Sequence, residues 1–101
     1  MDELPVLPRD PAELQRKAWL GDAVLALLVR RWILEERGQL SAQLFEDLTS
    51  NTFLNSVGNP TRIEALIGLL FERGGLAAAD EYMRVKILPH FLRQQRNRRL
   101  H

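Results

Sequence analysis

The chain has 101 residues, of which 46% are hydrophobic and 27% charged, with a formal net charge of +1, a composition typical of one soluble globular domain. It contains no cysteine, which excludes disulfide bonds and thiolate metal sites. The longest apolar run, Ala23 to Val29, is too short to cross a bilayer, which takes about 20 residues. Because the N-terminus is also not typical of a signal peptide, we expect a cytoplasmic protein with no membrane partner.

A long helix is predicted first. Asp10 is a good N-cap and Pro11 fits the first helical position. Gly38 is a natural stop, so this helix should have about 26 residues. Steps of three and four residues separate its apolar positions, which are Leu14, Ala18, Gly21, Leu25, Leu28 and Trp32.

Two shorter helices should follow, and no segment has the alternation of a strand. We expect one helix to run from the N-cap Ser41 to Gly58. The next should begin at the pair Asn59-Pro60, where asparagine caps and proline takes the first helical position. The pair Gly74-Gly75 should end it. The predicted fold class is therefore all-α.

A fourth helix is expected from about Leu76, with a break or kink at Pro89. The stretch from Phe91 is either a short helix or disordered. Residues 84–101 carry six arginines and lysines and no acid, whereas residues 1–83 hold eight bases and all 13 acids. A basic end indicates an anionic partner, usually nucleic acid, although a solvated tail has the same composition. We divide the chain into an N-terminal extension (1–9), a helical domain (10–92) and a basic C-terminal tail (93–101).

Two carboxylates stand out because each lies near a glycine inside a predicted helix. Asp22 follows Gly21 beside the apolar stripe, where a carboxylate is exposed, paired or bound. Glu64 precedes Gly68 by one turn. A glycine there costs roughly 1 kcal/mol relative to alanine, so both glycines indicate close approach of another backbone. Helices that cross at these glycines would bring the two acids together.

Two converging carboxylates repel each other unless a cation lies between them, and oxygen ligands indicate Mg²⁺ or Mn²⁺. A carboxylate-held Mg²⁺ activates water against a phosphodiester. Simpler roles are open for each acid taken alone. Asp22 could cap a neighbouring helix or pair with an arginine, and Glu64 could interact with the dipole of its own helix.

Three stretches stand out together, and the match they define spans roughly Leu14 to Pro89. They are LGDAVL in the first helix, the pair Ser50-Asn51, and EALIGLLFERGGLAAA further on. These stretches resemble the ribonuclease III catalytic domain, and most closely its small Mini-III subgroup. The resemblance implies a helical bundle, a homodimer, and Mg²⁺-dependent cleavage of double-stranded or structured RNA, of the rRNA-processing type. It places the catalytic metal ligands on Asp22 and Glu64.

Other acids of the family pattern are replaced. Gln15 and Ala18 stand where most members have glutamates, and Thr61 stands in place of an aspartate, although Mini-III members share the small residue and the threonine. By this resemblance, Gln15, Thr61 and Asn51 would support the metal from outside its ligand set. The usual RNA-binding insertion is missing between Phe53 and Asn59. Contacts to RNA phosphates are therefore expected from the C-terminal arginines, which are Arg93, Arg96, Arg98 and Arg99.

Two other functions stay open. A catalytically inactive ribonuclease III-like module that binds RNA or a ribosome is favoured by the replaced acids and the missing insertion. The other is a dimeric helical bundle that binds protein. Retention of Asp22 and Glu64 argues against this bundle, because an unpaired buried charge costs several kcal/mol.

Overall fold

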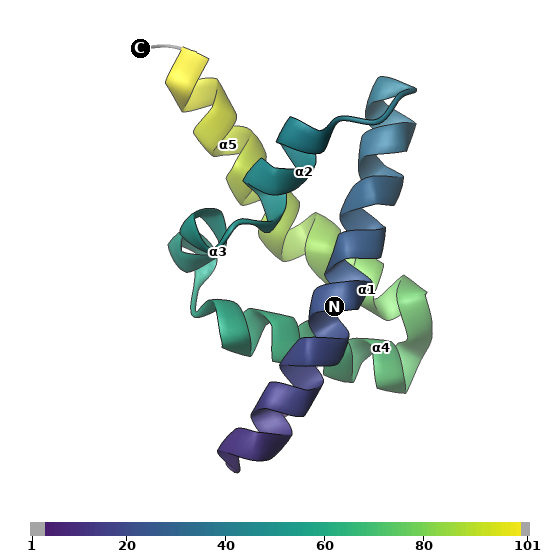
Figure 1. Cartoon of the computed structure of the whole chain (residues 1–101), viewed down its shortest axis with the longest axis vertical. Coiled ribbons are helices and arrows are strands. Elements are labelled where there is room, and N and C mark those ends of the chain that lie inside the picture. Colours follow the sequence, from purple (N-terminus) through teal and green to yellow (C-terminus); the bar gives the residue numbers. More distant parts are fainter. Residues whose placement is uncertain (1–3, 100–101) are drawn as a thin grey trace.

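The computed structural model describes residues 4–99, and all regular structure in that range is helical. Figure 1 shows a long helix crossed by a second one, with shorter helices on one side. The elements are α1 (Pro11–Arg37), α2 (Ala42–Thr49), α3 (Asn51–Val57), α4 (Pro60–Tyr82), a π-helical turn η1 (Met83–Ile87) and α5 (Leu88–Arg99). The predicted all-α class is confirmed for the described residues. None of their helices is both long and apolar enough to span a membrane.

Helix α1 begins and ends as the sequence predicts. The Asp10 carboxylate accepts a hydrogen bond from the backbone N–H of Glu13 at 3.3 Å, and Pro11 takes the first helical position. At the other end Gly38 has φ 70°, a left-handed conformation that glycine adopts without steric cost. Its N–H donates to the carbonyl oxygen of Leu34 at 3.0 Å. The helix has 27 residues, close to the predicted length.

The single helix expected between Ser41 and Gly58 is wrong, because the structure contains two helices there. Ser50 separates α2 from α3 with an extended backbone, φ −67° and ψ 148°. Its Oγ accepts a hydrogen bond from the N–H of Phe53 at 3.1 Å. Serine competes for the backbone in this way at helix starts, so a residue inside the expected helix caps a new one.

The helix break at the glycine pair is confirmed. Gly75 has φ 72° and ψ −168°, which interrupts the regular geometry of α4. The expected break or kink at Pro89 takes a different form, because the chain stays helical through η1 into α5. Proline lacks the N–H that the carbonyl of Val85 would accept in an α-helix. In η1 the N–H of Leu88 donates to Met83, five residues back, so the wider turn absorbs the proline.

Residues 93–99 of the predicted C-terminal tail continue α5. Of the two alternatives for this segment, the helix is confirmed as far as Arg99. The last two residues of the predicted tail, and the first three of the predicted N-terminal extension, lie outside the described residues.

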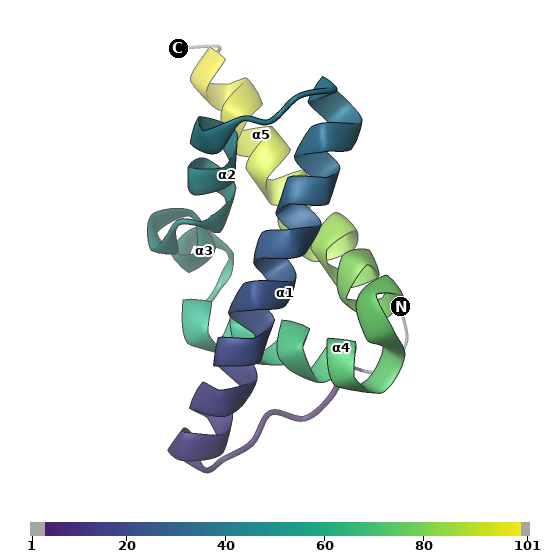
Figure 2. The same ribbon diagram turned by 45° about the vertical axis from the view of Figure 1, so that its right-hand side comes forward.

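The core lies between α1, α4 and the helices that pack around them; Figures 1 and 2 show how these helices are arranged. Each of the large apolar side chains at its centre contributes about 1.5–3 kcal/mol by burial. No polar or charged side chain is buried among the described residues. The most deeply buried large side chains are Leu25, Leu28, Val29, Leu48, Leu54, Ile67, Met83 and Ile87.

Candidate active site

Helices α1 and α4 touch backbone to backbone at two glycines. A Cβ atom placed on Gly21 would lie 1.6 Å from the carbonyl oxygen of Glu64. One placed on Gly68 would lie 2.3 Å from the carbonyl oxygen of Lys17. Real Cβ atoms essentially never come within 3.0 Å of such neighbours, so this crossing requires glycine on both helices. The predicted close approach at Gly21 and Gly68 is confirmed.

This crossing brings the carboxyl groups of Asp22 and Glu64 close enough to affect each other's charge. Burial is the largest cause that raises the pKa of Glu64, from 4.5 to about 7. The hydrogen bond to Asp22 and the repulsion from its charge raise this pKa further, as for any two carboxyl groups that share a site. In the absence of a cation, the Glu64 carboxyl therefore holds its proton to a higher pH than an ordinary glutamate does.

The acid pair is accessible from solvent on one side. Asp22 is exposed, whereas Glu64 is half-buried against the crossing. No group of three or more histidine, aspartate or glutamate side chains suited to a metal ion occurs within residues 4–99. The protein would thus offer a cation two carboxylates. That donor set fits Mg²⁺, which usually keeps several waters and binds through one or two carboxylates together with substrate phosphates.

The three supporting residues predicted from the sequence are not joined to the pair. Gln15 is exposed on α1, two turns before Asp22, and Thr61 is half-buried, one turn before Glu64. Both are thus on the same side of their helix as the acid they accompany. Asn51 is exposed at the start of α3. In the part of the chain that the structure describes, none of these three side chains hydrogen-bonds to either acid.

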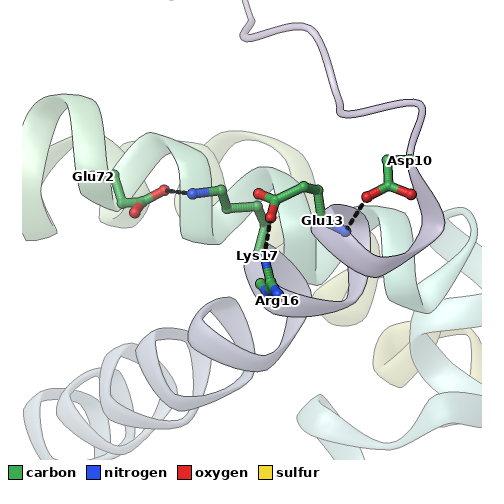
Figure 3. Close-up of polar contacts among 5 residues, drawn as sticks. All are labelled: Asp10, Glu13, Arg16, Lys17 and Glu72. Carbon is green, nitrogen blue, oxygen red and sulfur yellow. Dashed lines mark hydrogen bonds and ion pairs between the residues drawn. The ribbon is translucent and has the colours of Figure 1, made fainter.

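The sequence analysis missed a surface ion pair that joins α1 and α4 beside the crossing. Lys17 on α1 reaches Glu72 on α4, with Nζ and Oε1 2.8 Å apart (Figure 3). Lys17 lies four residues before Gly21, and Glu72 lies four residues after Gly68. The sequence could have predicted this ion pair, because the two opposite charges lie at the same distance in residues from the two glycines. Glu72 is thus paired with Lys17 and is separate from the acid pair.

The four C-terminal arginines, Arg93, Arg96, Arg98 and Arg99, are exposed on α5. In both ribbon views the yellow end of α5 points away from the crossing of α1 and α4 (Figures 1 and 2). None of them forms an ion pair with another described residue. The structure therefore does not bring these arginines to the acid pair. Arg98 instead lines a separate cavity beside α3.

A further feature near the acid pair escaped the sequence analysis. Trp19, one turn before Asp22, is 84% exposed. Ala23 and Leu27 follow it at intervals of four residues and are exposed too, as is Leu34. These four residues lie on one side of α1, and we call them the α1 apolar strip. The sequence could have indicated it, because Trp19 is not among the core-facing apolar positions predicted for this helix.

Comparison of the chain with protein families, with curated proteins and with solved structures finds no match.

Proposed function

We propose that the protein is a Mg²⁺-dependent endoribonuclease of the ribonuclease III type that cleaves double-stranded or structured RNA as a homodimer. One observation carries this proposal. Two carboxyl groups from different helices meet at a crossing that demands glycine on both helices. A contact that raises the pKa of Glu64 is unfavourable for folding at neutral pH, and a bound cation would relieve it.

In this proposal Asp22 and Glu64 hold the cation. A bound Mg²⁺ supplies activation of water and stabilisation of charge at the phosphate. Asp22 is exposed, so a phosphodiester could approach it, whereas the backbone of Glu64 is held against Gly21. A cation held there would favour the ionised form of Glu64, because its positive charge would offset the repulsion from Asp22. Mn²⁺ would serve in the same position.

The homodimer is supported by the α1 apolar strip. An exposed tryptophan in line with exposed leucines is typical of an interaction surface. The strip begins one turn from Asp22. Two copies joined along it would therefore carry their acid pairs close to the same interface, and one duplex could contact both.

A catalytically inactive RNA- or ribosome-binding module is the second candidate. It is favoured by the small number of acids, because the described residues contain no third carboxylate beside the pair. It is also favoured by the separation of the basic end of α5 from the crossing (Figure 1). Such a module would bind RNA through α5 without using Asp22 or Glu64.

A cleavage assay distinguishes these two candidates. A labelled RNA duplex is incubated with Mg²⁺, Mn²⁺ or EDTA and with wild type, Asp22→Asn, Glu64→Gln or Glu72→Gln. The last variant is a matched control, since it makes the same change on α4 but breaks only the surface ion pair to Lys17. We expect metal-dependent cutting that falls at least about 100-fold in the first two variants and by less than about threefold in the control.

Duplex binding without cutting in any metal, unchanged by Asp22→Asn and Glu64→Gln, would establish the inactive module instead. Cutting that persists in EDTA would also refute the proposal. If the protein neither binds nor cuts the duplex, the remaining possibility is the protein-binding helical bundle.

A further inference from the structure

A cavity of about 570 Å³ lies between α5 and the corner where α2 meets α3. Neither Asp22 nor Glu64 lines it, so it is distinct from the acid pair. Figure 1 shows α5 passing beside α2 and α3 at this end of the molecule. The volume falls in the range of small-molecule sites, about 300–1,000 Å³, and is ample for one nucleotide.

The floor of the cavity is preformed. Phe53 of α3 and Phe91 of α5 are buried and meet edge to face, with ring centroids 5.1 Å apart. Beside them the Gln94 side-chain amide donates to the Ser56 hydroxyl oxygen at 3.0 Å, which ties α5 to α3. A binding site held by such contacts needs little ordering when a ligand enters.

Four polar side chains of the lining have no bonding partner of their own within residues 4–99. They are Thr52, Gln95, Asn97 and Arg98. The hydroxyl and the two amides both donate and accept hydrogen bonds, whereas the guanidinium only donates. A matching ligand therefore has an uncharged part with neighbouring donors and acceptors, and an anionic part for Arg98.

One anionic residue, Asp47, also lines the cavity, and its Oδ1 already accepts from the Gln43 amide at 2.8 Å. Its negative charge disfavours an anion beside it, so an anionic group of a ligand fits best at Arg98. The last turn of α5 attracts cations through the helix dipole, which alone would account for the arginine. The dipole does not account for Gln95, Asn97 and Thr52 around the same cavity.

We infer that this cavity binds one unpaired nucleotide of RNA, with its base edge at the Gln95 amide and its phosphate at Arg98, one turn further along α5. Base edges present adjacent donors and acceptors that asparagine and glutamine side chains match. Unpaired bases are the parts of RNA that proteins read in this way. That the nucleotide belongs to RNA rests on the proposed function. The cavity would then hold a loop or overhang next to the duplex.

The positions of the arginines on α5 supply a matched control. Arg98 follows Phe91 by seven residues, or two turns, so it continues the buried side of the helix toward the cavity. Arg96 is exposed and does not line the cavity. Replacement of either residue by glutamine removes one positive charge from α5.

The test measures fluorescence anisotropy with a labelled unpaired oligoribonucleotide of about five nucleotides and with a blunt duplex, both in EDTA. Wild type is compared with Arg98→Gln, Arg96→Gln and the double variant Gln95→Ala/Asn97→Ala. For the unpaired probe, we expect Arg98→Gln and the double variant to weaken binding about tenfold. Arg96→Gln should weaken binding of both probes by about the same small factor.

Three results would overturn the inference. They are equal losses for Arg98→Gln and Arg96→Gln, unchanged binding by the double variant, and no binding of the unpaired probe by wild type. Because EDTA prevents metal-dependent cleavage, the outcome is independent of the proposed endonuclease. A protein that binds through the cavity and cuts nothing refutes the proposed function alone. One that cuts duplex but binds the unpaired probe equally well in all variants refutes this inference alone.

Discussion

At the scale of single residues, Gly21 and Gly68 set how closely α1 and α4 approach. A Cβ atom added at either glycine would clash with backbone atoms of the opposite helix. A change of side-chain rotamer could not relieve this clash. The same contact holds Glu64 against Asp22. The geometry of the acid pair and the stability of the fold thus depend on the same two residues.

Substitution of these glycines by alanine should therefore destabilise the protein strongly. We expect Gly21→Ala or Gly68→Ala to lower the free energy of unfolding by about 3 kcal/mol or more, because the two helices must separate. Gly58→Ala is the control, since its Cβ would meet the Ile63 side chain at an ordinary 3.5 Å. Urea unfolding measures the difference. A loss at Gly21 no larger than at Gly58 would contradict the close crossing.

The raised pKa of Glu64 predicts how stability depends on pH. Between 4.5, the unperturbed value, and about 7, the folded protein holds a proton that the unfolded chain releases. The free energy of unfolding therefore falls as the pH rises through this window. For a half-buried group we expect a loss on the order of 1 kcal/mol between pH 5 and pH 8. Urea unfolding in EDTA should show this loss in wild type, and the loss should be smaller in Glu64→Gln.

If the acid pair holds a cation, as proposed, then Mg²⁺ should reverse this loss. At pH 8 a concentration 100-fold above the dissociation constant stabilises the folded state by about 2.7 kcal/mol. The melting temperature should rise with Mg²⁺, and binding near pH 7 should release protons. Asp22→Asn and Glu64→Gln should remove both effects. An equal rise with potassium chloride at the same ionic strength would point to general screening instead.

At the scale of helices, local chemistry determines where each one begins and ends. The caps at Asp10, Ser41 and Asn59 could be predicted, because each side chain accepts from a backbone N–H three residues later. Ser50 does the same for Phe53. It was missed because apolar residues on both sides continue one helical period. The spacing of apolar residues cannot distinguish one long helix from two consecutive helices when both helices have the same apolar side.

Ser50→Ala tests this cap. Loss of the bond to the Phe53 N–H should cost about 1 kcal/mol and loosen the corner between α2 and α3. Thr52→Ala is the neighbouring control, because this exposed side chain bonds to no other described residue, and it should change stability by less than about 0.5 kcal/mol. Urea unfolding compares the two variants. Equal effects would mean that the corner is held by packing alone.

At the scale of the whole molecule, the sequence predicts contacts within a helix better than contacts between helices. The acid pair could be predicted because the glycines identify where two helices touch. The cavity between α5 and the corner of α2 and α3 could not, because that corner depends on the break at Ser50. Likewise the arginines form one cluster in sequence, yet α5 directs Arg98 to a cavity that excludes Arg93 and Arg96.

The α1 apolar strip predicts an association between copies of the chain. A buried tryptophan contributes more to an interface than most residues, and Trp19 is 84% exposed in the single chain. We expect sedimentation at micromolar concentration to show a dimer. Trp19→Ser should raise the dissociation constant of this dimer at least about tenfold. Leu92→Ser is the control, because Leu92 is an exposed apolar residue on α5, away from the strip.

The same two variants connect the dimer to the proposed activity. If one duplex contacts the acid pairs of both copies, Trp19→Ser should lower duplex cleavage in proportion to the loss of dimer, and a higher protein concentration should restore it by mass action. Leu92→Ser should cut as wild type does. A wild-type monomer at micromolar concentration, or full cleavage by monomeric Trp19→Ser, would show that each acid pair acts alone.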